Sequence, residues 1–320
     1  MTSLHLSAPS RLHFGLLARG PAAPRQFGGL GLMVEEPGLE ITAEPSDSWR
    51  ASGPLADRAG TIARRVAAKL IEDGKFPPPL ALTVHRAPPE HVGLGTGTQL
   101  SLAVAKLVTM SAGLDLSAPA LAAVTGRGAR SGVGLHGFDH GGLIVEGGHR
   151  GESGIPPLLS RMDWPAEWSV LVVVPPVSPG LHGPDEMRAF SALPPMPEAE
   201  TDRLCRLVLL GILPAVAERN LAEFGEALSE LQHRVGSWFA PAQGGVFASP
   251  RITEIVGWLR AEGLSGVGQS SWGPALYGVS RDGPERRDSL ARSLRSRFAL
   301  DAGSVLWTAA SPRGAVLRDR

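Results

Sequence analysis

The alternation of apolar and polar residues at the start of the chain predicts β-sheet. Residues from Leu4 to Leu17 alternate as two short strands separated by Ala8-Pro9-Ser10. Two further apolar stretches, Gly28 to Val34 and Leu39 to Ala43, predict a hairpin that turns at Glu36-Pro37-Gly38, because proline and glycine favour turns. The chain is therefore expected to begin as a sheet.

A helical period follows these strands. Between Pro54 and Asp73 apolar residues recur every three or four positions, and Gly74 follows as a natural C-terminal cap. After a strand from Leu80 to His85 and a glycine-rich loop, a second helix is predicted from about Thr98 to Gly113. Ser117 is a typical N-terminal cap for a short third helix.

The rest of the chain mixes strands and helices. Strands are predicted at 143–146, 170–174, 275–280 and 304–308, and helices at 201–219, 221–235, 252–261 and 285–298. Residues 147–168 are rich in Gly, Pro and charge, so we place a boundary there and divide the chain into an N-terminal domain, 1–160, and a C-terminal domain, 161–320. Neither half shows the regular alternation of a doubly wound sheet, and the predicted fold class is therefore α+β.

Composition narrows the class of protein. The 320 residues are 43% hydrophobic and 19% charged, as in a soluble globular protein with a sizeable core. The 31 basic residues balance 31 acidic ones, so we expect no nucleic-acid partner and only local affinity for phosphate. A single cysteine, Cys205, excludes a disulfide framework and is typical of the reducing cytoplasm. The longest apolar stretch, Leu207 to Ala217, is far shorter than the roughly 20 residues that cross a bilayer, so no membrane partner is expected.

Residues Pro88 to Leu107 hold the most informative motif, PPEHVGLGTGTQLSLAVAKL. A strand precedes a loop in which Gly93, Gly95 and Gly97 alternate with other residues, and a helix follows. Backbone N–H groups in such a loop, the helix N-terminus and threonine hydroxyls can converge on an anion. The spacing matches neither the P-loop nor the dinucleotide fingerprint. The residues alone leave two interpretations open, a phosphate cradle and a tight turn from strand to helix.

A second glycine-rich run lies in the C-terminal half. It reads SGVGQSSWGPALYGV from Ser265 to Val279 and offers backbone donors together with Gln269, Ser270 and Ser271. Two such loops in separate halves of the chain favour a cleft between domains.

A third glycine-rich run, residues 126–148, reads GRGARSGVGLHGFDHGGLIVEGG. Its candidate side chains are Arg127, Arg130, His136, Asp139 and His140. Polar residues on a glycine-rich loop indicate a site more than core packing. A turn in which Asp139 caps its own backbone also explains part of the pattern. The H-x-x-D-H spacing is not a recognised zinc pattern, and we assign no metal ligands.

Three of these segments resemble, in order and spacing, the motifs of the GHMP kinase superfamily. They are APSRLHFG (8–15), PEHVGLGTGTQ (89–99) and SGVGQSSWGPALYG (265–278). In the kinases the second motif runs P-x-x-x-G-L-G-S-S-A-A; Pro89, Gly93, Leu94 and Gly95 match, but Gly97 stands where the second serine would help to hold magnesium and phosphate. This departure counts against ATP-dependent phosphoryl transfer.

The variant motif resembles a non-kinase branch of the superfamily. GLGTGTQ, together with SRLHFGLL, GRGARSGVG, FDHGGLIVEGG and GQSSWGP, looks like the β-ribofuranosylaminobenzene 5′-phosphate synthases. The resemblance implies an N-terminal domain like ribosomal protein S5 domain 2 and a ferredoxin-like C-terminal domain, with the substrate in the cleft between them. It implies a pentosyltransferase of tetrahydromethanopterin biosynthesis, which joins 4-aminobenzoate or 4-hydroxybenzoate to phosphoribosyl pyrophosphate and releases carbon dioxide and pyrophosphate. Mg²⁺ is the expected cofactor, and a homodimer is what the family suggests.

This chemistry suggests roles for individual residues. We expect the second motif to hold pyrophosphate through Gly93, Gly95, Thr96, Gly97, Thr98 and Gln99. Asp139 and His140 are the predicted catalytic pair, which would steady positive charge or position magnesium or the amine. Predicted substrate-binding residues are Arg11, His13, Arg127, Arg130, Gln269, Ser270, Ser271 and Trp272. Arginines suit phosphate and carboxylate, whereas strand packing explains His13, and packing beside a loop explains Trp272, equally well.

Two other functions stay open. One is an ATP-dependent GHMP kinase acting on a small alcohol, and the other is a non-catalytic GHMP-fold protein that binds a ligand as a regulator. The sequence does not decide which aromatic acid is the acceptor.

Overall fold

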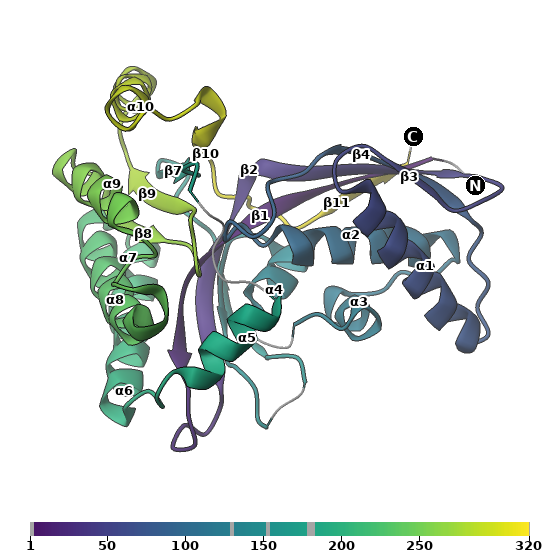
Figure 1. The fold of residues 1–320 in the computed structure, drawn as a ribbon, viewed down its shortest axis with the longest axis horizontal. Coiled ribbons are helices and arrows are strands. Elements are labelled where there is room, and N and C mark those ends of the chain that lie inside the picture. Colours follow the sequence, from purple (N-terminus) through teal and green to yellow (C-terminus); the bar gives the residue numbers. More distant parts are fainter. Residues whose placement is uncertain (1–2, 129–130, 152–153, 178–182, 320) are drawn as a thin grey trace.

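The computed structural model describes residues 3–128, 131–151, 154–177 and 183–319. The molecule is elongated and contains two β-sheets; the long strands β1 (Leu4–Ala18) and β2 (Phe27–Pro45) of the larger sheet run along it toward the smaller sheet (Figure 1). Both chain termini lie at the end away from the smaller sheet. The α+β class predicted from the sequence is confirmed.

The larger sheet contains seven of the described strands. Their order is β11-β1-β2-β4-β3, with β5 between β2 and β6 on the remaining part of β2. The strands are β1 (Leu4–Ala18), β2 (Phe27–Pro45), β3 (Arg50–Ser52), β4 (Leu80–Arg86), β5 (Leu143–Glu146), β6 (Leu158–Met162) and β11 (Val316–Asp319). Among the described strands of this sheet, only β3 and β4 pair in parallel.

The predicted hairpin through Glu36-Pro37-Gly38 is wrong, and so is the division of the first stretch into two strands. Both stretches are single long strands that pair with each other, and the ladder shifts register between Ala8/Leu39 and Ser10/Val34. The proline and glycine therefore produce a bulge in a continuous strand instead of a chain reversal. The reason is burial, because the two halves of each strand enter different hydrophobic cores.

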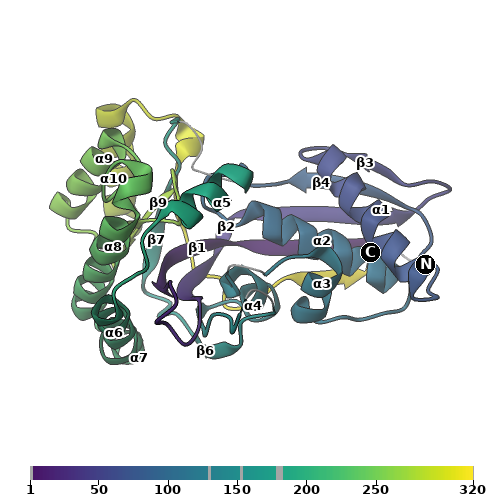
Figure 2. The ribbon, with the colours of Figure 1, turned by 60° about the horizontal axis from the view of Figure 1, so that its bottom comes forward.

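Helices cover one face of the larger sheet (Figure 2). They are α1 (Ala56–Glu72), α2 (Thr96–Ser111), α3 (Ala118–Thr125) and α4 (Val133–His140). The predicted apolar positions Ile62, Val66 and Leu70 of α1 are buried, as are those of α2. The period that predicted these helices is thus the stripe that packs on the sheet. Residues 133–140 form helix α4, whereas the glycines of this segment predict a loop.

The smaller sheet is antiparallel with the order β10-β7-β9-β8. Its strands are β7 (Ser169–Val173), β8 (Ser265–Gln269), β9 (Leu276–Ser280) and β10 (Val305–Thr308). The helices of this part are α5 (Gly183–Ala192), α6 (Glu198–Leu207), α7 (Leu213–Ala217), α8 (Leu221–Gln243), α9 (Pro250–Ala261) and α10 (Pro284–Phe298), with the single turns η1 (Val208–Ile212) and η2 (Ala302–Ser304). Strand β8 differs from the prediction, because the glycines of this segment predict a loop.

The boundary near residue 160 does not separate the two sheets along the chain. Strand β6, Leu158–Met162, crosses it and pairs with β5. The last described strand, β11, returns to pair with β1 at the far end of the larger sheet. The C-terminal segment therefore contributes to both sheets. None of the helices in the described part of the chain has the length and hydrophobicity needed to span a membrane.

Candidate active site

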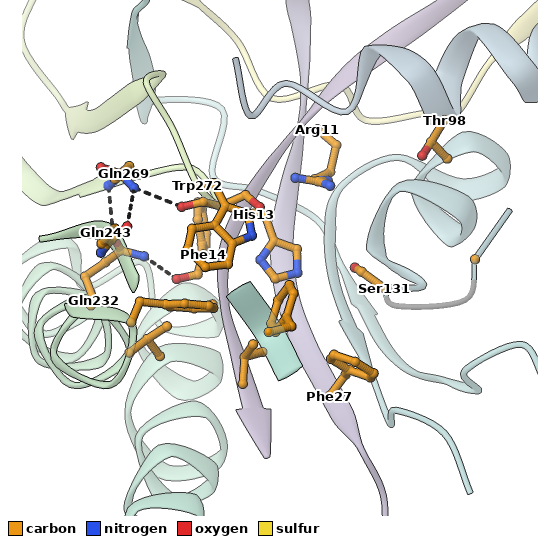
Figure 3. A pocket seen from close by; sticks show the side chains of 18 of the residues that line it. Arg11, His13, Phe14, Phe27, Thr98, Ser131, Gln232, Gln243, Gln269 and Trp272 are labelled. Carbon is orange, nitrogen blue, oxygen red and sulfur yellow. Dashed lines mark hydrogen bonds between the residues drawn. The ribbon is translucent and has the colours of Figure 1, made fainter. Parts of the chain in front are cut away.

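A cavity of about 220 Å³ opens where the two parts of the molecule meet. Its walls come from β1, the first turn of α2, the loop before α4, α5, α8 and the loop after β8. The sequence-predicted residues that line it are Arg11, His13, Thr98, Arg127, Gln269, Ser271 and Trp272. In Figure 3, Arg11, Thr98 and Ser131 lie on one side of the cavity and three glutamines on the other. The fold thus brings distant glycine motifs to one cavity.

One end of the cavity is cationic. Its described polar side chains are Arg11, Thr98, Arg127 and Ser131. The Arg11 guanidinium donates a hydrogen bond to the carbonyl of Gly93 (3.4 Å), and Arg127 Nε donates to the Ser101 hydroxyl on α2 (3.1 Å). These contacts hold both guanidiniums beside the N-terminus of α2. Two guanidiniums with two hydroxyls form a set suited to phosphate or carboxylate oxygens.

His13 lies on β1 two residues after Arg11 and also lines the cavity. Burial and the positive charge of Arg11 lower the pKa of its imidazole from 6.5 to about 3. The ring is therefore neutral at physiological pH. Its backbone N–H donates to the hydroxyl of Ser270 (2.9 Å), and its carbonyl accepts from the N–H of Ser271 (3.2 Å). A neutral ring here adds no positive charge beside a bound substrate.

The loop from Gly93 to Gln99 supports the cationic end more than it lines the cavity. Of its six predicted phosphate-binding residues, Thr98 is the one among the described lining residues. A Cβ at Gly93 would lie 2.2 Å from the Ser270 carbonyl oxygen, and its φ is +92°, so this position requires glycine. Gly95, the N-cap of α2, has φ +74°. These glycines allow the strand to turn directly into the helix.

Other residues of the same loop hold neighbouring segments. The Thr96 hydroxyl donates to a carbonyl of the preceding loop (2.9 Å), and the Gln99 amide donates to a carbonyl of α4 (2.7 Å). Gly97 leaves room for Arg58, because a Cβ there would lie 2.7 Å from Nη2 of that guanidinium, which pairs with Glu90. Phosphate binding by these residues stays a prediction.

The segment after β8 connects this loop to β1. The buried Ser270 hydroxyl donates to the Gly93 carbonyl (2.6 Å) while it accepts from His13. Ser270 is not among the described lining residues, whereas its neighbours Gln269 and Ser271 are. Ser270 therefore fixes the relative position of the motifs, and its neighbours face the cavity.

An aromatic wall closes the other side of the cavity. The Trp272 ring lies 4.5 Å from Phe239 and 5.3 Å from Phe190, centroid to centroid, in edge-to-face arrangements. Trp272 is only 6% exposed, yet it lines the cavity. The ring therefore packs in the core as expected, and contact between Trp272 and an aromatic substrate stays a prediction.

Three glutamines, Gln232, Gln243 and Gln269, form the end opposite the arginines (Figure 3). Gln269 Nε2 donates to Gln243 Oε1 (3.5 Å) and to the Ser271 carbonyl (3.0 Å). The backbone N–H of Gln269 donates to Gln232 Oε1 (2.9 Å). This end of the cavity is polar but carries no formal charge on these side chains.

The predicted catalytic pair lies elsewhere. Asp139 and His140 are exposed and line a separate surface depression with Arg161 and Arg313. Both carboxylate oxygens of Asp139 accept from the N–H of Ala118 (2.9 and 3.2 Å), which caps α3 in place of the predicted Ser117 side chain. Their catalytic role stays a prediction that this position does not favour.

The remaining candidates are also placed away from the cavity or are not described. His136 is buried and its Nε2 contacts the Pro156 carbonyl (2.7 Å), and burial lowers the pKa of the ring. Arg25, in the loop between β1 and β2, is not one of the predicted site residues; it donates to the carbonyls of Gly147 (2.6 Å) and Gly148 (2.8 Å) and so holds this loop against the segment after β5. Arg130 lies outside the described residues.

Glu146, which the sequence analysis did not select, is fully buried at the end of β5. Its carboxylate accepts from the backbone N–H groups of Gly132 (3.3 Å) and Gly148 (2.6 Å). Burial raises the pKa of this carboxyl from 4.5 to about 7, although both hydrogen bonds and Arg25 act in the opposite direction. Through its hydrogen bond with Gly132, the N-cap residue of α4, Glu146 fixes the start of this helix next to Ser131 of the cationic end.

The cavity does not fit a magnesium site built from protein carboxylates. None of its described lining residues is Asp or Glu. Over the part of the chain that the structure describes, no group of three His, Cys, Asp or Glu side chains is placed to hold a metal ion. Mg²⁺ is a hard cation that proteins usually hold with one or two carboxylates and the oxygens of a bound phosphate. The protein side chains supply only hydroxyl and amide oxygens here.

The sequence analysis missed the contribution of α8. Gln232, Val235, Gly236, Phe239 and Gln243 all line the cavity. They follow the three- and four-residue spacing of a single helix face. The signal that could have found them is the presence of two glutamines within an otherwise apolar stripe.

Comparisons with known proteins agree with this architecture. Residues 61–145 match the family model described as GHMP kinases N terminal domain, and residues 212–300 match the one described as GHMP kinases C terminal. A beta-ribofuranosylphenol 5'-phosphate synthase of Methanothermobacter thermautotrophicus is 31% identical to this chain, and the alignment covers 98% of each protein. The enzyme of the same name from Archaeoglobus fulgidus is 34% identical over 92% of this chain and 93% of its own length.

Solved structures show the same fold at low sequence identity. A homoserine kinase from Cytophaga hutchinsonii superposes with a TM-score of 0.73 at 15% identity, covering 99% of this chain and 98% of its own. A 4-(cytidine 5'-diphospho)-2C-methyl-D-erythritol kinase gives 0.61 at 21% identity, covering 95% and 98%. The predicted GHMP fold is confirmed. With the full-length similarity above, the chain belongs to the beta-ribofuranosylphenol 5'-phosphate synthase family of the GHMP kinase superfamily.

Proposed function

We propose that this protein is a pentosyltransferase that joins an aromatic acid, 4-hydroxybenzoate or 4-aminobenzoate, to phosphoribosyl pyrophosphate in tetrahydromethanopterin biosynthesis. The observation that carries the proposal is the polarity of the cavity. Arginines lie at one end, amides and aromatic rings lie at the other, and the described lining residues include no carboxylate. Such a cavity matches a substrate pair that is anionic at one end and aromatic at the other.

The proposed reaction is balanced without any further reactant. The bond between ribose C1 and the pyrophosphate oxygen breaks, and pyrophosphate leaves with the electron pair. The ring carbon that carries the carboxylate bonds to C1, which interrupts the aromatic system. The bond to the carboxyl carbon then breaks, its electrons restore the ring, and carbon dioxide leaves. No oxidant, reductant or nucleophilic side chain is required.

The residues around the cavity have roles that suit these steps. Arg11 and Arg127 bind the phosphates and the carboxylate, and thereby stabilise the charge that develops on pyrophosphate. His13, as a neutral ring, does not repel the positive charge that develops at C1. Trp272 packs against the aromatic acid. Mg²⁺ remains part of the proposal as an ion that would arrive with pyrophosphate, and no step here depends on it.

Release of labelled carbon dioxide from carboxyl-labelled 4-hydroxybenzoate and 4-aminobenzoate tests the proposal. We expect release that requires both the protein and phosphoribosyl pyrophosphate. An ATP-consumption assay with a panel of alcohols is run in parallel. ATP consumption without carbon dioxide release would contradict the proposal and indicate a kinase. Ligand-dependent thermal stabilisation without turnover in either assay would contradict it in favour of a binding protein.

A further inference from the structure

The aromatic acid has only one orientation that matches the charges of the cavity. In the proposed reaction the ring carbon that bonds to ribose also carries the carboxylate, so both lie at the end that holds the phosphates. The para substituent then points to the opposite end, which is formed by Gln232, Gln243 and Gln269. Among the described lining residues there is no charged side chain on that side, so it suits a neutral para group.

Hydrogen bonds fix how these amides are turned. A backbone N–H that meets a side-chain amide must face its oxygen, because the amide nitrogen is a donor. The N–H of Ala248 donates to Gln269 Oε1 (2.8 Å), and the N–H of Gln269 donates to Gln232 Oε1 (2.9 Å). Gln243 Nε2 donates to the Val246 carbonyl (2.9 Å). The oxygen and nitrogen of each amide are therefore assigned by their partners.

The same contacts show which amide can recognise a ligand. Gln232 uses its oxygen for Gln269 and donates from Nε2 to the Phe14 carbonyl. Gln269 directs Nε2 to two acceptors and its oxygen to a backbone N–H. Gln243 is half-buried, and its Oε1 receives only the long contact of 3.5 Å among the described residues. Every amide oxygen has two lone pairs, but Gln232 and Gln269 are buried, so the oxygen of half-buried Gln243 is the most accessible of the three for a further hydrogen bond.

We propose that Gln243 recognises the para substituent of the aromatic acid by accepting a hydrogen bond from a neutral hydroxyl or amino group. This proposal rests on the proposed function for the orientation of the acid. Gln269 and Gln232 act as positioning residues, because the chain of amides described above holds the Gln243 oxygen in the wall of the cavity. The aromatic wall of Trp272 and Phe239 places the ring beside this oxygen.

Binding measurements test the proposal without turnover. The probes are 4-hydroxybenzoate, 4-aminobenzoate and 4-methylbenzoate; the methyl group has nearly the same size but cannot donate a hydrogen bond. Binding is better than rate here, because a para donor also activates the ring chemically. We expect wild-type protein to bind the better of the two donors at least about fivefold more tightly than 4-methylbenzoate, since a hydrogen bond to the Gln243 oxygen that the methyl compound leaves unmade costs about 1–3 kcal/mol.

The variants are Gln243→Leu, Gln243→Glu and a control, Ser237→Leu, at an exposed position of the same helix. In Gln243→Leu the preference for the donor over the methyl compound should fall to within about threefold, whereas Gln243→Glu, which keeps an acceptor, and Ser237→Leu should retain it. General damage to the site would weaken all three ligands equally and leave the ratio unchanged.

Two results would overturn the proposal. One is a wild-type protein that binds 4-methylbenzoate as tightly as both donors, which needs no variant to fold. The other is a folded Gln243→Leu protein with an undiminished ratio. The carbon dioxide assay is scored separately: discrimination by Gln243 without turnover would contradict the proposed reaction only, and turnover without discrimination would contradict the role of Gln243 only. The relative affinities of the two donors indicate the acceptor.

Discussion

The two ends of the cavity select ligands in different ways. At the cationic end, Arg11 and Arg127 come from segments more than a hundred residues apart and meet only because β1 and the loop before α4 lie beside α2. At the amide end, Gln232 and Gln243 lie on one face of a single helix, and backbone N–H groups orient the side-chain amides of Gln232 and Gln269. The arginines bind phosphate oxygens through their charge and their forked N–H donors, whereas the neutral end distinguishes ligands by a single hydrogen bond and by shape.

Loss of charge at the cationic end should have the largest effect. For Arg11→Met we expect kcat/KM for phosphoribosyl pyrophosphate to fall by about a thousandfold, the upper range for removal of one donor that stabilises developing negative charge. The preference for a para donor over 4-methylbenzoate should not change, because both acids carry the carboxylate that Arg11 contacts and they differ only at the amide end. Steady-state kinetics and acid binding measure the two effects, with Arg206→Met on the exposed face of α6 as the matched control. A changed ratio of the affinities for the para donor and 4-methylbenzoate would show that the ends are not independent.

Titration of Glu146 should lower the free energy of unfolding in a defined pH window. Because its pKa is raised from 4.5 to about 7, the folded protein holds a proton that the unfolded chain has lost between these values. The free energy of unfolding therefore falls as pH rises from 4.5 to about 7, by up to about 3 kcal/mol.

Urea unfolding of wild-type protein and Glu146→Gln across this range checks the prediction. Other groups titrate in both proteins, so the difference in unfolding free energy isolates Glu146. The free energy of unfolding of Glu146→Gln should increase relative to that of the wild type as pH rises. Glu44→Gln, at an exposed position of β2, is the control and should show no such trend. A constant difference between wild type and Glu146→Gln would show that the buried carboxyl does not titrate in this window.

The smallest effect is expected at the aromatic wall. Trp272→Leu keeps an apolar side chain but removes the ring that contacts Phe239 and Phe190. Binding of the aromatic acid should weaken by about tenfold, because an aromatic contact contributes about 0.5–1.5 kcal/mol beyond its buried area. The KM for phosphoribosyl pyrophosphate should stay within about twofold. A larger rise in that KM than in the dissociation constant of the acid would reverse the assignment of the two ends.

Local periodicity was sufficient for much of the fold. The helix at 56–72 and the strand at 80–86 were predicted within two residues, because their apolar residues alternate with the period of the structure they form. The error at Glu36-Pro37-Gly38 arose because turn residues were interpreted without their partner strand. Pairing along the whole of β1 keeps β2 continuous, and the extra residues form a bulge.

The candidate site was predicted in part for a similar reason. Glycine motifs identified the segments that meet at the cavity, and Arg11, Thr98 and Trp272 do line it. Asp139 and His140 share a segment with Arg127, but α4 carries them to the surface, where Asp139 caps α3. Residues close in sequence were thus separated by the direction of a helix that the glycines had concealed.

The sequence by itself determined the α+β class, most helix and strand positions and, through its motifs, the GHMP fold and its synthase branch, because these follow from local periodicity and from short ordered patterns. Only the tertiary structure decided which side chains face one cavity, which glycines serve close packing, and that α8 supplies an uncharged end opposite the arginines. Those properties depend on contacts between segments far apart in the chain, and no local pattern specifies the distance or direction of such contacts.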